Sequence, residues 1–316
     1  MKRLEGRIAV VAGAARGAGR GVARMLGAAG ATVYCTGRSS DSGRGPSNRA
    51  ETIDETAALV SKAGGTGVAV RVDHSVEADV AGLFARVKRE RGRLDVLVNV
   101  LGGPEAEWGG SFWKQPLDRA RAHFEGWFWS HLTTIRYAAP LMVAKKSGLI
   151  VELTEHETLG YRGSLFYDLA RVASLRMAYG VAEDLTSKGV TCVAVTPGFM
   201  RTEAVLDHFG ASEANWREAA ETKEGQRFLL SASETPCYVG QAVVALAGDE
   251  NVRSKSGGLF SSWGLAMEYD FADVDGTRPN WGAAFAQYAG DIPLPAGGAA
   301  FEWILQPKRA GVAAGV

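Results

Sequence analysis

The sequence predicts an α/β protein built on a doubly wound parallel sheet. Short apolar runs rich in β-branched residues recur along the chain, helix-like stretches alternate with them, and glycines cluster between the first run and the first helix. Unbroken apolar runs are typical of strands that are covered on both faces. Strict strand–helix alternation gives parallel strands joined by right-handed crossovers, so helices cover both sides of the sheet in a three-layer αβα arrangement.

The predicted elements follow one another in a regular order. Strands are expected at residues 7–12, 31–36, 67–72, 94–99, 148–153 and 190–195. Helices are expected at residues 17–29, 52–63, 77–91, 117–145 and 165–188, then between 201 and 226 and near 239–247. Ligands of such sheets bind at the carboxyl ends of the strands, so we expect the chemistry just after each strand.

Composition narrows the possible partners. The 316 residues carry 35 Lys and Arg against 35 Asp and Glu, so no net field attracts nucleic acid or an anionic membrane. No run of about 18 apolar residues occurs, which predicts a cytoplasmic protein with neither an export signal nor a membrane span. Cys35, Cys192 and Cys237 lie far apart, and their spacing is not that of a metal site or a disulfide framework. A small molecule is the expected partner.

Three glycines follow the first predicted strand. Gly13, Gly17 and Gly19 have the spacing G-x3-G-x-G, where a strand turns into a helix. Glycine tolerates positive φ and has no Cβ, so the N–H groups at the helix start can approach a pyrophosphate. The loop therefore predicts a phosphate cradle; a tight turn without a ligand is the alternative.

Three motifs together resemble those of the short-chain dehydrogenase/reductase (SDR) family. AGAARGAG at residues 12–19 is similar to its TGxxxGxG loop, NVLG at 99–102 to its NNAG, and YDLAR at 167–171 to its YxxxK. The likeness covers about residues 5–262, and it is strongest to the branch of dehydrogenase/reductase member 1. It implies a Rossmann fold in a single domain at residues 1–262, with a substrate lid at 200–235 and a C-terminal extension at 263–316.

The resemblance also implies how a nicotinamide cofactor is held. Asp73 would contact adenine, Asn99 would support the central sheet, Pro197 and Gly198 would flank the nicotinamide, and Thr202 would bind its amide or the phosphates. The predicted cofactor-binding residues are Gly13, Ala15, Arg16, Gly17, Ala18, Gly19, Arg38, Ser39, Asp73, His74, Asn99, Tyr167, Arg171, Pro197, Gly198 and Thr202. Members of the family commonly form dimers or tetramers, so a homodimer or homotetramer is expected.

The end of the second strand predicts NADP(H) as the cofactor. NAD sites usually place an acidic residue there for the ribose diol, whereas a 2′-phosphate requires a cation. This strand runs into Thr36-Gly37-Arg38-Ser39, without a carboxylate. Arg38 can form two hydrogen bonds to a phosphate, Ser39 can donate another, and Arg16 can reach the same place. The alternative is that both arginines are solvated loop residues.

The catalytic positions depart from the family pattern. Tyr167 stands where the family has its proton donor, but Arg171 replaces the usual Lys. A guanidinium can still stabilise the phenolate and bind ribose hydroxyls, but it cannot readily pass a proton along. Where the family has a Ser, the chain offers Thr154 or Glu155, and neighbouring residues at a strand end point to opposite faces. Thr154 would bind the substrate oxygen. Glu155, if protonated, would donate to a carbonyl and, if ionised, would favour a cationic amine or iminium; the alternative is that it only pairs with Arg171.

The fourth family position, an Asn that anchors the proton relay, falls near Trp127. Trp108, Trp113 and Trp129 lie in the same region, and these tryptophans either belong to a core or subunit interface or form the wall of a pocket. His156 and Glu157 are interpreted as loop residues, and no metal site is expected.

Three functions remain open from the sequence. The leading one is an NADPH-dependent oxidoreductase that transfers a hydride between nicotinamide and a carbonyl, alcohol, imine or amine carbon of a small molecule. The second keeps the cofactor but carries out an isomerase, dehydratase or cyclase reaction with Tyr167 and Glu155 as acid and base. The third is a non-catalytic nucleotide-binding protein.

Overall fold

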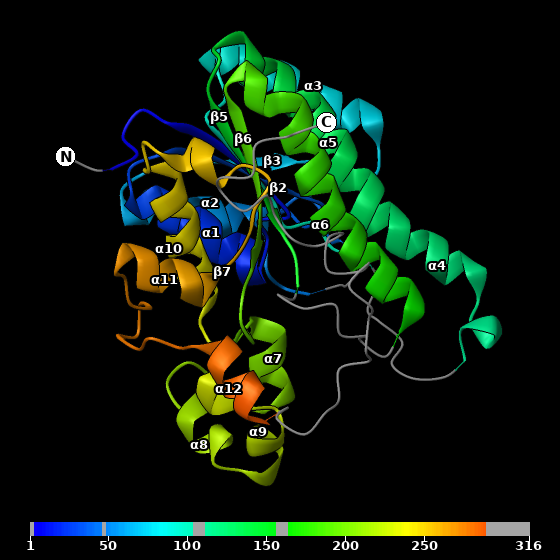
Figure 1. Ribbon diagram of the computed structural model, residues 1–316, viewed down its shortest axis with the longest axis vertical. Helices are drawn as coiled ribbons and strands as arrows, with labels where there is room; N and C mark the ends of the chain where they lie inside the picture. The colour runs from blue at the N-terminus through cyan, green and yellow to red at the C-terminus, as the bar shows by residue number, and fades with distance from the viewer. Residues whose placement is uncertain (1–2, 46–48, 104–110, 156–163, 289–316) are drawn as a thin grey trace, which may run out of the picture. The chain divides into compact units, whose positions relative to one another are not determined.

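The computed structural model describes residues 3–45, 49–103, 111–155 and 164–288. Its strands follow the order β3-β2-β1-β4-β5-β6-β7 in one seven-stranded sheet (Figure 1). This is the strand order of a doubly wound sheet, and the predicted fold class is confirmed. Two compact units make up the chain: Met1–Val72, Thr196–Gly248 and Ser261–Ile292 form the first, and Asp73–Val195, Asp249–Phe260 and Pro293–Val316 form the second.

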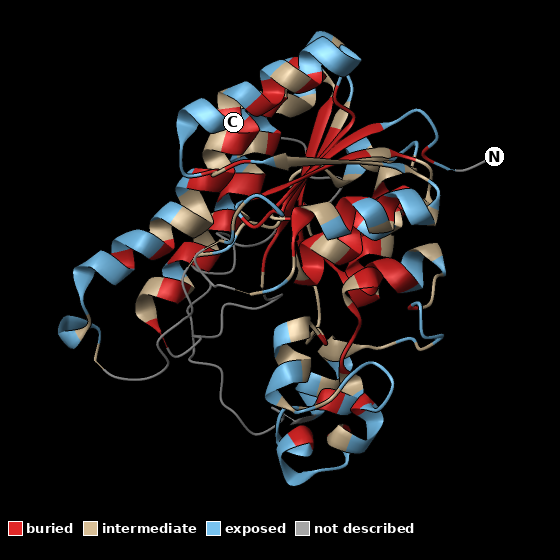
Figure 2. Ribbon diagram, turned by 180° about the vertical axis from the view of Figure 1, so that it is seen from behind, coloured by how far each residue is buried: buried red, intermediate tan, exposed pale blue. Residues whose placement is uncertain are grey.

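Three parallel strands form the sheet of the first unit. They are β1 (Ile8–Ala12), β2 (Thr32–Gly37) and β3 (Thr66–Arg71). In the register of these strands, Val10 lies opposite Tyr34, and Tyr34 lies opposite Val68. All of β1 is buried, as its unbroken apolar sequence predicts, and Figure 2 shows buried strands beside helices that are buried along one side.

Glycines allow two helices of the first unit to pack closely. These helices are α1 (Gly17–Ala28) and α10 (Pro236–Ala247), which lie side by side in Figure 1. A Cβ on Gly21 would lie 2.0 Å from the carbonyl oxygen of Pro236, so no larger residue fits there.

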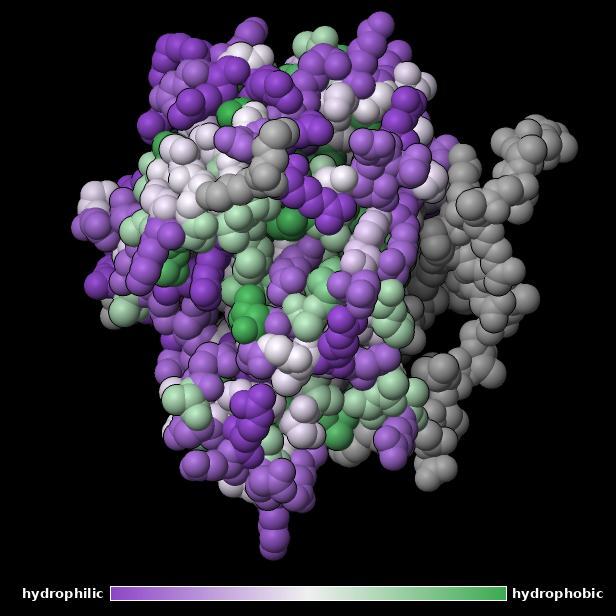
Figure 3. All heavy atoms as spheres, turned by 90° about the vertical axis from the view of Figure 1, so that its left-hand side faces the viewer, coloured by the Kyte–Doolittle hydropathy of each residue, from purple (hydrophilic) through white to green (hydrophobic). Residues whose placement is uncertain are grey.

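On the face of the molecule drawn in Figure 3, hydrophobic side chains occur in small groups between hydrophilic ones.

The helix α2 (Ile53–Ala63) begins with a capping box. The Thr52 hydroxyl accepts a hydrogen bond from the Glu55 N–H at 3.1 Å, and the Glu55 carboxylate accepts one from the Thr52 N–H at 3.2 Å. Both N–H groups would otherwise lack a partner at the helix start. The polar segment after β2 therefore ends in a well-defined helix start.

The second unit contains the remaining long strands. β4 (Val96–Asn99), β5 (Gly148–Leu153) and β6 (Val190–Thr196) pair in parallel, and α3 (Glu77–Arg91) precedes them. The ends of all six strands predicted from the sequence agree with the structure to within two residues. The helix α6 (Leu165–Leu185) connects β5 to β6 and carries the YDLAR motif.

The helix predicted at residues 117–145 is present at residues 117–144, but it contains a π-helical turn that the sequence did not indicate. The structure has α4 (Leu117–Phe124), a π-helical turn at Glu125–Trp129 and then α5 (Ser130–Ala144). The Ser130 hydroxyl donates to the Gly126 carbonyl at 2.6 Å. Gly126 also packs on backbone, since a Cβ there would lie 2.5 Å from the Gly103 Cα. The turn inserts one residue into the helix ladder, a local feature that apolar periodicity does not reveal.

After β6 the chain forms short helices in the first unit. These are α7 (Glu203–His208), α8 (Trp216–Ala220) and α9 (Lys223–Arg227), and α12 (Trp281–Tyr288) lies near them in Figure 1. The short strand β7 (Leu259–Ser261) and α11 (Ser262–Tyr269) precede α12. The fully buried Arg201 ties this region together: it donates to the Ser233 carbonyl at 2.7 Å, pairs with Asp275 at 2.8 Å and stacks on Trp216 at 3.8 Å.

Candidate active site

The glycine loop between β1 and α1 has the backbone geometry of a phosphate cradle. Gly13 and Gly17 have φ values of +91° and +51°, in the region that favours glycine. A Cβ on Gly19 would lie 2.1 Å from the Gly13 carbonyl oxygen, so glycine is required at this point of α1. Ala15 and Ala18 belong to the same turn and are buried. The start of α1 thus has the backbone geometry that binds an anion, and in this structure its Gly17 N–H donates to the Glu203 carboxylate at 2.8 Å.

The residues predicted to bind a 2′-phosphate lie in the same unit. The Nη1 atom of Arg16 is buried without a hydrogen-bond partner among the residues described. Buried donors of this kind are rare in folded proteins, and a phosphate oxygen would satisfy this one. Arg38 is exposed, whereas Ser39 is buried and its hydroxyl accepts from the Gly45 N–H at 3.1 Å. The loop and its cations fit a phosphorylated dinucleotide.

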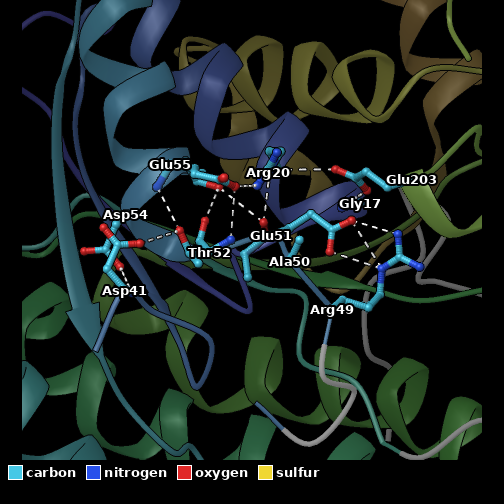
Figure 4. Close-up of polar contacts among 12 residues, drawn as sticks. Gly17, Arg20, Asp41, Arg49, Ala50, Glu51, Thr52, Asp54, Glu55 and Glu203 are labelled. Atoms are coloured by element: carbon cyan, nitrogen blue, oxygen red, sulfur yellow. Dashed lines mark hydrogen bonds and ion pairs between the residues drawn. The ribbon is translucent and has the colours of Figure 1, made fainter. Parts of the chain in front are cut away.

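Two charged residues that the sequence interpretation missed lie beside Arg16. Burial lowers the pKa of Arg16; Glu51 and Glu203 oppose this, while Arg49 and Arg38 lower the pKa further. Arg49 and Glu51 pair at 2.7 Å, as Figure 4 shows. The Arg-rich composition of residues 35–52 was the available signal, but it could not identify which arginine returns to the glycine loop.

The predicted nicotinamide turn follows β6. The Gly198 N–H donates to the Glu234 carboxylate at 3.0 Å, and the Ser262 hydroxyl donates to the same oxygen at 2.5 Å. Thr202 caps α7 by accepting from the Val205 N–H at 3.3 Å. Its methyl group also lies 3.3 Å from the position of a Cβ on Gly17, so Thr202 lies against the glycine loop, and its role toward a cofactor stays a prediction.

Glu234 is an acid that the sequence interpretation did not single out. It is 1% exposed, and its Oε1 atom has no hydrogen-bond partner within the described chain. Burial raises the pKa of Glu234 to about 8. Its backbone also bridges to the turn, since the Glu234 N–H donates to Phe199 and the Arg201 N–H donates to Glu234. Glu234 therefore holds the turn that contains Gly198 through both backbone and side chain.

Asp73 and His74 lie in the second unit, after β3. The Asp73 carboxylate accepts from the Ser75 N–H at 3.0 Å and from its hydroxyl at 2.7 Å. His74 is buried, with its Nδ1 atom 2.8 Å from the Thr134 hydroxyl. These contacts fix the turn that carries both residues, and their roles toward a cofactor stay predictions.

Asn99 belongs to a buried polar network. Its amide donates to the Glu152 carboxylate at 2.5 Å, and the other oxygen of Glu152 lies 2.6 Å from Nδ1 of His131. His131 Nε2 lies 3.1 Å from the Leu101 carbonyl oxygen. All three side chains are fully buried. A glutamate inside the apolar run GLIVEL signals such a partner, because a buried carboxylate must be hydrogen-bonded.

Tyr167, Arg171 and Glu155 form one cluster in the second unit. Tyr167 and Arg171 lie one turn apart on α6 and are 7% and 5% exposed. The Tyr167 hydroxyl donates to Oε2 of Glu155, and Arg171 Nη2 lies 2.9 Å from Glu155 Oε1. One carboxylate therefore joins the phenol to the guanidinium, and the side chain that carries it is 41% exposed.

Thr154, the other residue near the predicted serine position, is more deeply buried than Glu155. It is 1% exposed, and its hydroxyl has no hydrogen-bond partner in the part of the chain described. Its N–H donates to the Val195 carbonyl at 3.0 Å, as a strand residue. The structure thus brings Glu155, and not Thr154, into contact with Tyr167.

Trp127 completes the cluster. The guanidinium of Arg171 lies 4.0 Å from the centre of its ring, and the Tyr167 ring meets it edge-on at 6.0 Å. The Trp127 carbonyl, in the π-helical turn, accepts from the Ser174 hydroxyl at 3.2 Å. Trp113 and Trp129 are exposed, and Trp108 lies outside the described residues.

The remaining site predictions concern metals and membranes. Residues 156–163, which include His156 and Glu157, lie outside the description. Within the ranges that the structure covers, no three His, Cys, Asp or Glu side chains come together as a metal site would require, and no helix is long and apolar enough to span a membrane. Cys35, Cys192 and Cys237 are buried free thiols, and burial raises the pKa of Cys35 to about 12.

The seven-stranded sheet and the glycine loop define a Rossmann-type fold. A family model described as enoyl-(acyl carrier protein) reductase matches residues 13–254. The chain is 36% identical over 281 residues to dehydrogenase/reductase SDR family member 1 from Homo sapiens, and the match covers 87% of this chain and 85% of that protein. The chain therefore belongs to the short-chain dehydrogenase/reductase family of oxidoreductases.

More distant relatives agree with this assignment. A 7alpha-hydroxysteroid dehydrogenase from Clostridium sardiniense is 28% identical over 215 residues, covering 66% of this chain and 76% of that one. A crystal structure of a short-chain dehydrogenase from Mycobacterium thermoresistibile has a TM-score of 0.73 at 21% identity, covering 88% of this chain and 92% of that chain. This likeness shows the fold.

Proposed function

We propose that the protein is an NADP(H)-dependent oxidoreductase that transfers a hydride between nicotinamide and a carbonyl or imine carbon of a small molecule. The observation that carries this proposal is the Glu155–Tyr167–Arg171 cluster, because a carboxylate there joins a guanidinium to a phenol that stands at the position of the family's proton donor. Family membership supports the hydride chemistry, which the nicotinamide supplies when it is bound.

The charge around the glycine loop supports NADP(H) over NAD(H). Arg16 has a buried donor without a partner in the described structure, and Arg38 is exposed at the end of β2. Neither Arg38 nor Ser39 is the carboxylate that an NAD site would place there. A 2′-phosphate would use these donors through charge-assisted hydrogen bonds.

In carbonyl reduction, each side chain of the cluster would have a separate role. Tyr167 donates its phenolic proton to the substrate oxygen as hydride reaches the carbon. Arg171 stabilises the resulting phenolate electrostatically, while its stacking on Trp127 fixes its orientation. Glu155 relays a proton from bulk solvent to the phenolate oxygen, since its carboxylate contacts that oxygen and is part-exposed. Glu155 thus replaces the proton relay that Arg171 cannot provide.

The segment at residues 200–235 is proposed as a substrate lid within a domain at 1–262, with 263–316 as an extension. Its helices enclose a small core of Trp216, Ala220 and Leu230, against which Phe199 and Leu206 pack. A small separate core lets a segment move as a unit. Assembly as a homodimer or homotetramer is proposed from the family resemblance.

A substrate panel with Tyr167→Phe as the test variant examines the proposal. The panel contains aldehydes, ketones, oxosteroids and cyclic imines, the steroids because one relative is named as a hydroxysteroid dehydrogenase. We expect NADPH oxidation with at least one member, and a decrease of about 10²–10⁴-fold in kcat for Tyr167→Phe. Equal turnover by the variant would contradict the role of Tyr167.

The hydrogen bond between Tyr167 and Glu155 also favours a second candidate, an acid–base reaction without net redox change. In such an isomerase, dehydratase or cyclase, one group would add a proton and the other would remove one. NADPH absorbance separates the two functions: it falls with product in the first and stays constant while product accumulates in the second.

A further inference from the structure

A carboxylate from α7 occupies the start of the glycine-loop helix. Glu203 Oε2 accepts a hydrogen bond from the Gly17 N–H at 2.8 Å, and Glu203 Oε1 lies 3.7 Å from Arg20 Nε (Figure 4). The N–H groups at such a helix start are where a Rossmann-type loop receives a phosphate oxygen. An anionic side chain of the protein therefore lies where the cofactor's pyrophosphate is proposed to bind.

A second carboxylate of the same helix engages the arginine cluster. Asp207 lies four residues after Glu203 on α7, and its Oδ2 is 2.7 Å from Nη2 of Arg49. The hydrogen bonds of Arg49 to Glu51 and Asp207 raise its pKa. Arg49 in turn acts electrostatically on Arg16, which is proposed to bind the 2′-phosphate.

These contacts belong to one short element of the proposed lid. Thr202 caps α7 and lies against Gly17, so Glu203 is held at the loop by its neighbour as well as by its own hydrogen bond. The Glu203 side chain is 28% exposed and the Asp207 side chain 66% exposed. Both ion contacts can therefore exchange with water, and neither is locked into a core.

On the basis of the proposed cofactor, we propose that α7 is an internal competitor of NADP(H), with Glu203 in the place of a pyrophosphate oxygen and Asp207 in the place of the 2′-phosphate. Two carboxylates one helical turn apart match the two anionic groups of the dinucleotide, and each contacts a different part of its site. Cofactor binding then requires α7 to release both contacts, and Glu203 and Asp207 set the cofactor affinity.

The two carboxylates have separable effects. Glu203 blocks the pyrophosphate contact, which NADPH and NADH share, so its removal favours both cofactors. Arg49 is paired with both Glu51 and Asp207, so removal of Asp207 leaves the Glu51 pair but takes away one negative charge beside the proposed 2′-phosphate site, which favours NADPH alone. An internal competitor reduces the apparent affinity to the intrinsic affinity multiplied by the fraction of molecules in which the competitor is released. Each substitution is therefore expected to tighten binding by about threefold to tenfold.

Calorimetric titration of the full chain with NADPH and with NADH tests the proposal. We expect Glu203→Gln to tighten the binding of both dinucleotides by a similar factor. Asp207→Asn is expected to tighten the binding of NADPH by about threefold to tenfold. Its affinity for NADH should stay within about twofold of that of the parent chain. Stopped-flow binding should assign the gain of Glu203→Gln to the association rate.

Glu218→Gln is the matched control, because Glu218 is exposed on α8 and its substitution removes the same charge without touching either contact. Weaker or unchanged binding of both dinucleotides in Glu203→Gln would overturn the competitor role while leaving the proposed function intact. If neither the parent chain nor any variant bound a dinucleotide, the proposed function would fail and the inference with it. Equal effects of Asp207→Asn on NADPH and NADH would overturn the assignment of Arg49 to the 2′-phosphate.

Discussion

The glycine loop of the first unit and the Tyr167 cluster of the second relate differently to the family motifs. Gly13, Gly17 and Gly19 match the TGxxxGxG loop, whereas Glu155 and Arg171 stand where the family has Ser and Lys, and the family's Asn position falls near Trp127. The loop requires glycine, because Gly13 and Gly17 have positive φ and a Cβ on Gly19 would lie 2.1 Å from the Gly13 carbonyl oxygen.

The Tyr167 cluster is constrained by charge and hydrogen bonding instead of by backbone space. Arg171 contacts Glu155 through an ion pair and Trp127 through its ring, so each departure from the family pattern supports another. The backbone of the loop accepts only glycine at these positions. A polar cluster can accept other side chains if its members change together, so that each hydrogen bond or ion pair keeps a partner.

The glycine loop should be the more sensitive of the two regions. In Gly19→Ala the new Cβ meets the Gly13 carbonyl, and the start of α1 must shift away from the phosphate position. We expect NADPH binding to weaken by about 100-fold or more, equivalent to about 3 kcal/mol, measured by calorimetry. The control is Gly82→Ala on α3, where a Cβ meets nothing within 4 Å. That variant should gain about 0.5–1 kcal/mol in stability and retain binding; full binding by Gly19→Ala would contradict the cradle.

Replacing Arg171 with the Lys that is usual in the family should lower the catalytic activity. Arg171→Lys loses the planar stacking on Trp127 and one ion contact with Glu155, so kcat/KM should fall by about tenfold to 30-fold. The triple variant with Glu155→Ser and Trp127→Asn should recover part of that loss. If Arg171→Lys alone were as active as the parent enzyme, these residues would not act as a unit.

The choice of cofactor should respond to Arg38. Arg38→Ala removes a guanidinium at the end of β2, so the ratio of NADPH to NADH affinity should decrease by about tenfold. Lys62→Ala, on the exposed last turn of α2, removes the same charge as a control. An unchanged ratio in Arg38→Ala would show that the arginine is a solvated loop residue.

The smallest effect on turnover is expected at Glu234, whose signature is the pH dependence of stability. Its folded-state pKa of about 8 lies above the ordinary value of 4.5, so the folded chain retains a proton that the unfolded chain loses. Stability should therefore fall as pH rises from about 4.5 to about 8. The surrounding groups are Ser262, Asp273 and Arg201, with the Gly198 N–H.

Urea unfolding across that pH range provides the measurement for Glu234. Glu234→Gln keeps an acceptor for Gly198 but does not titrate. Between about pH 4.5 and about pH 8, its free energy of unfolding should therefore fall less than that of the parent chain, by on the order of 3 kcal/mol. Parallel pH curves for the parent and the variant would show that Glu234 does not titrate in this range.

Sequence patterns were sufficient for the strands because those segments are apolar and buried, as β1 illustrates. They also identified Tyr167, Arg171 and Glu155 as candidates. They could not choose between Thr154 and Glu155, because that depends on which face of the chain each side chain occupies beyond the end of β5. The π-helical turn before Ser130 arises from one local hydrogen bond and a close glycine contact, neither of which has a periodic signal.

Contacts between charged residues that are far apart in the chain could not be predicted from the sequence. Glu203 meets Gly17 across 186 positions and Asp207 meets Arg49 across 158, so no local spacing connects them. Buried Glu234 and Arg201 were missed for the same reason, since their partners come from distant segments. Motif spacing identifies groups within one turn or one loop; tertiary structure decides which loops meet.

The central claim is that Glu155 completes the Tyr167–Arg171 site. The most direct test is the steady-state rate of NADPH oxidation by Glu155→Gln, with a substrate identified in the panel and with the NADPH affinity measured in parallel. We expect kcat to fall by about 100-fold while NADPH affinity stays within twofold, because the phenolate loses its proton source but the cofactor site is unaltered. Unchanged kcat in Glu155→Gln would contradict the claim.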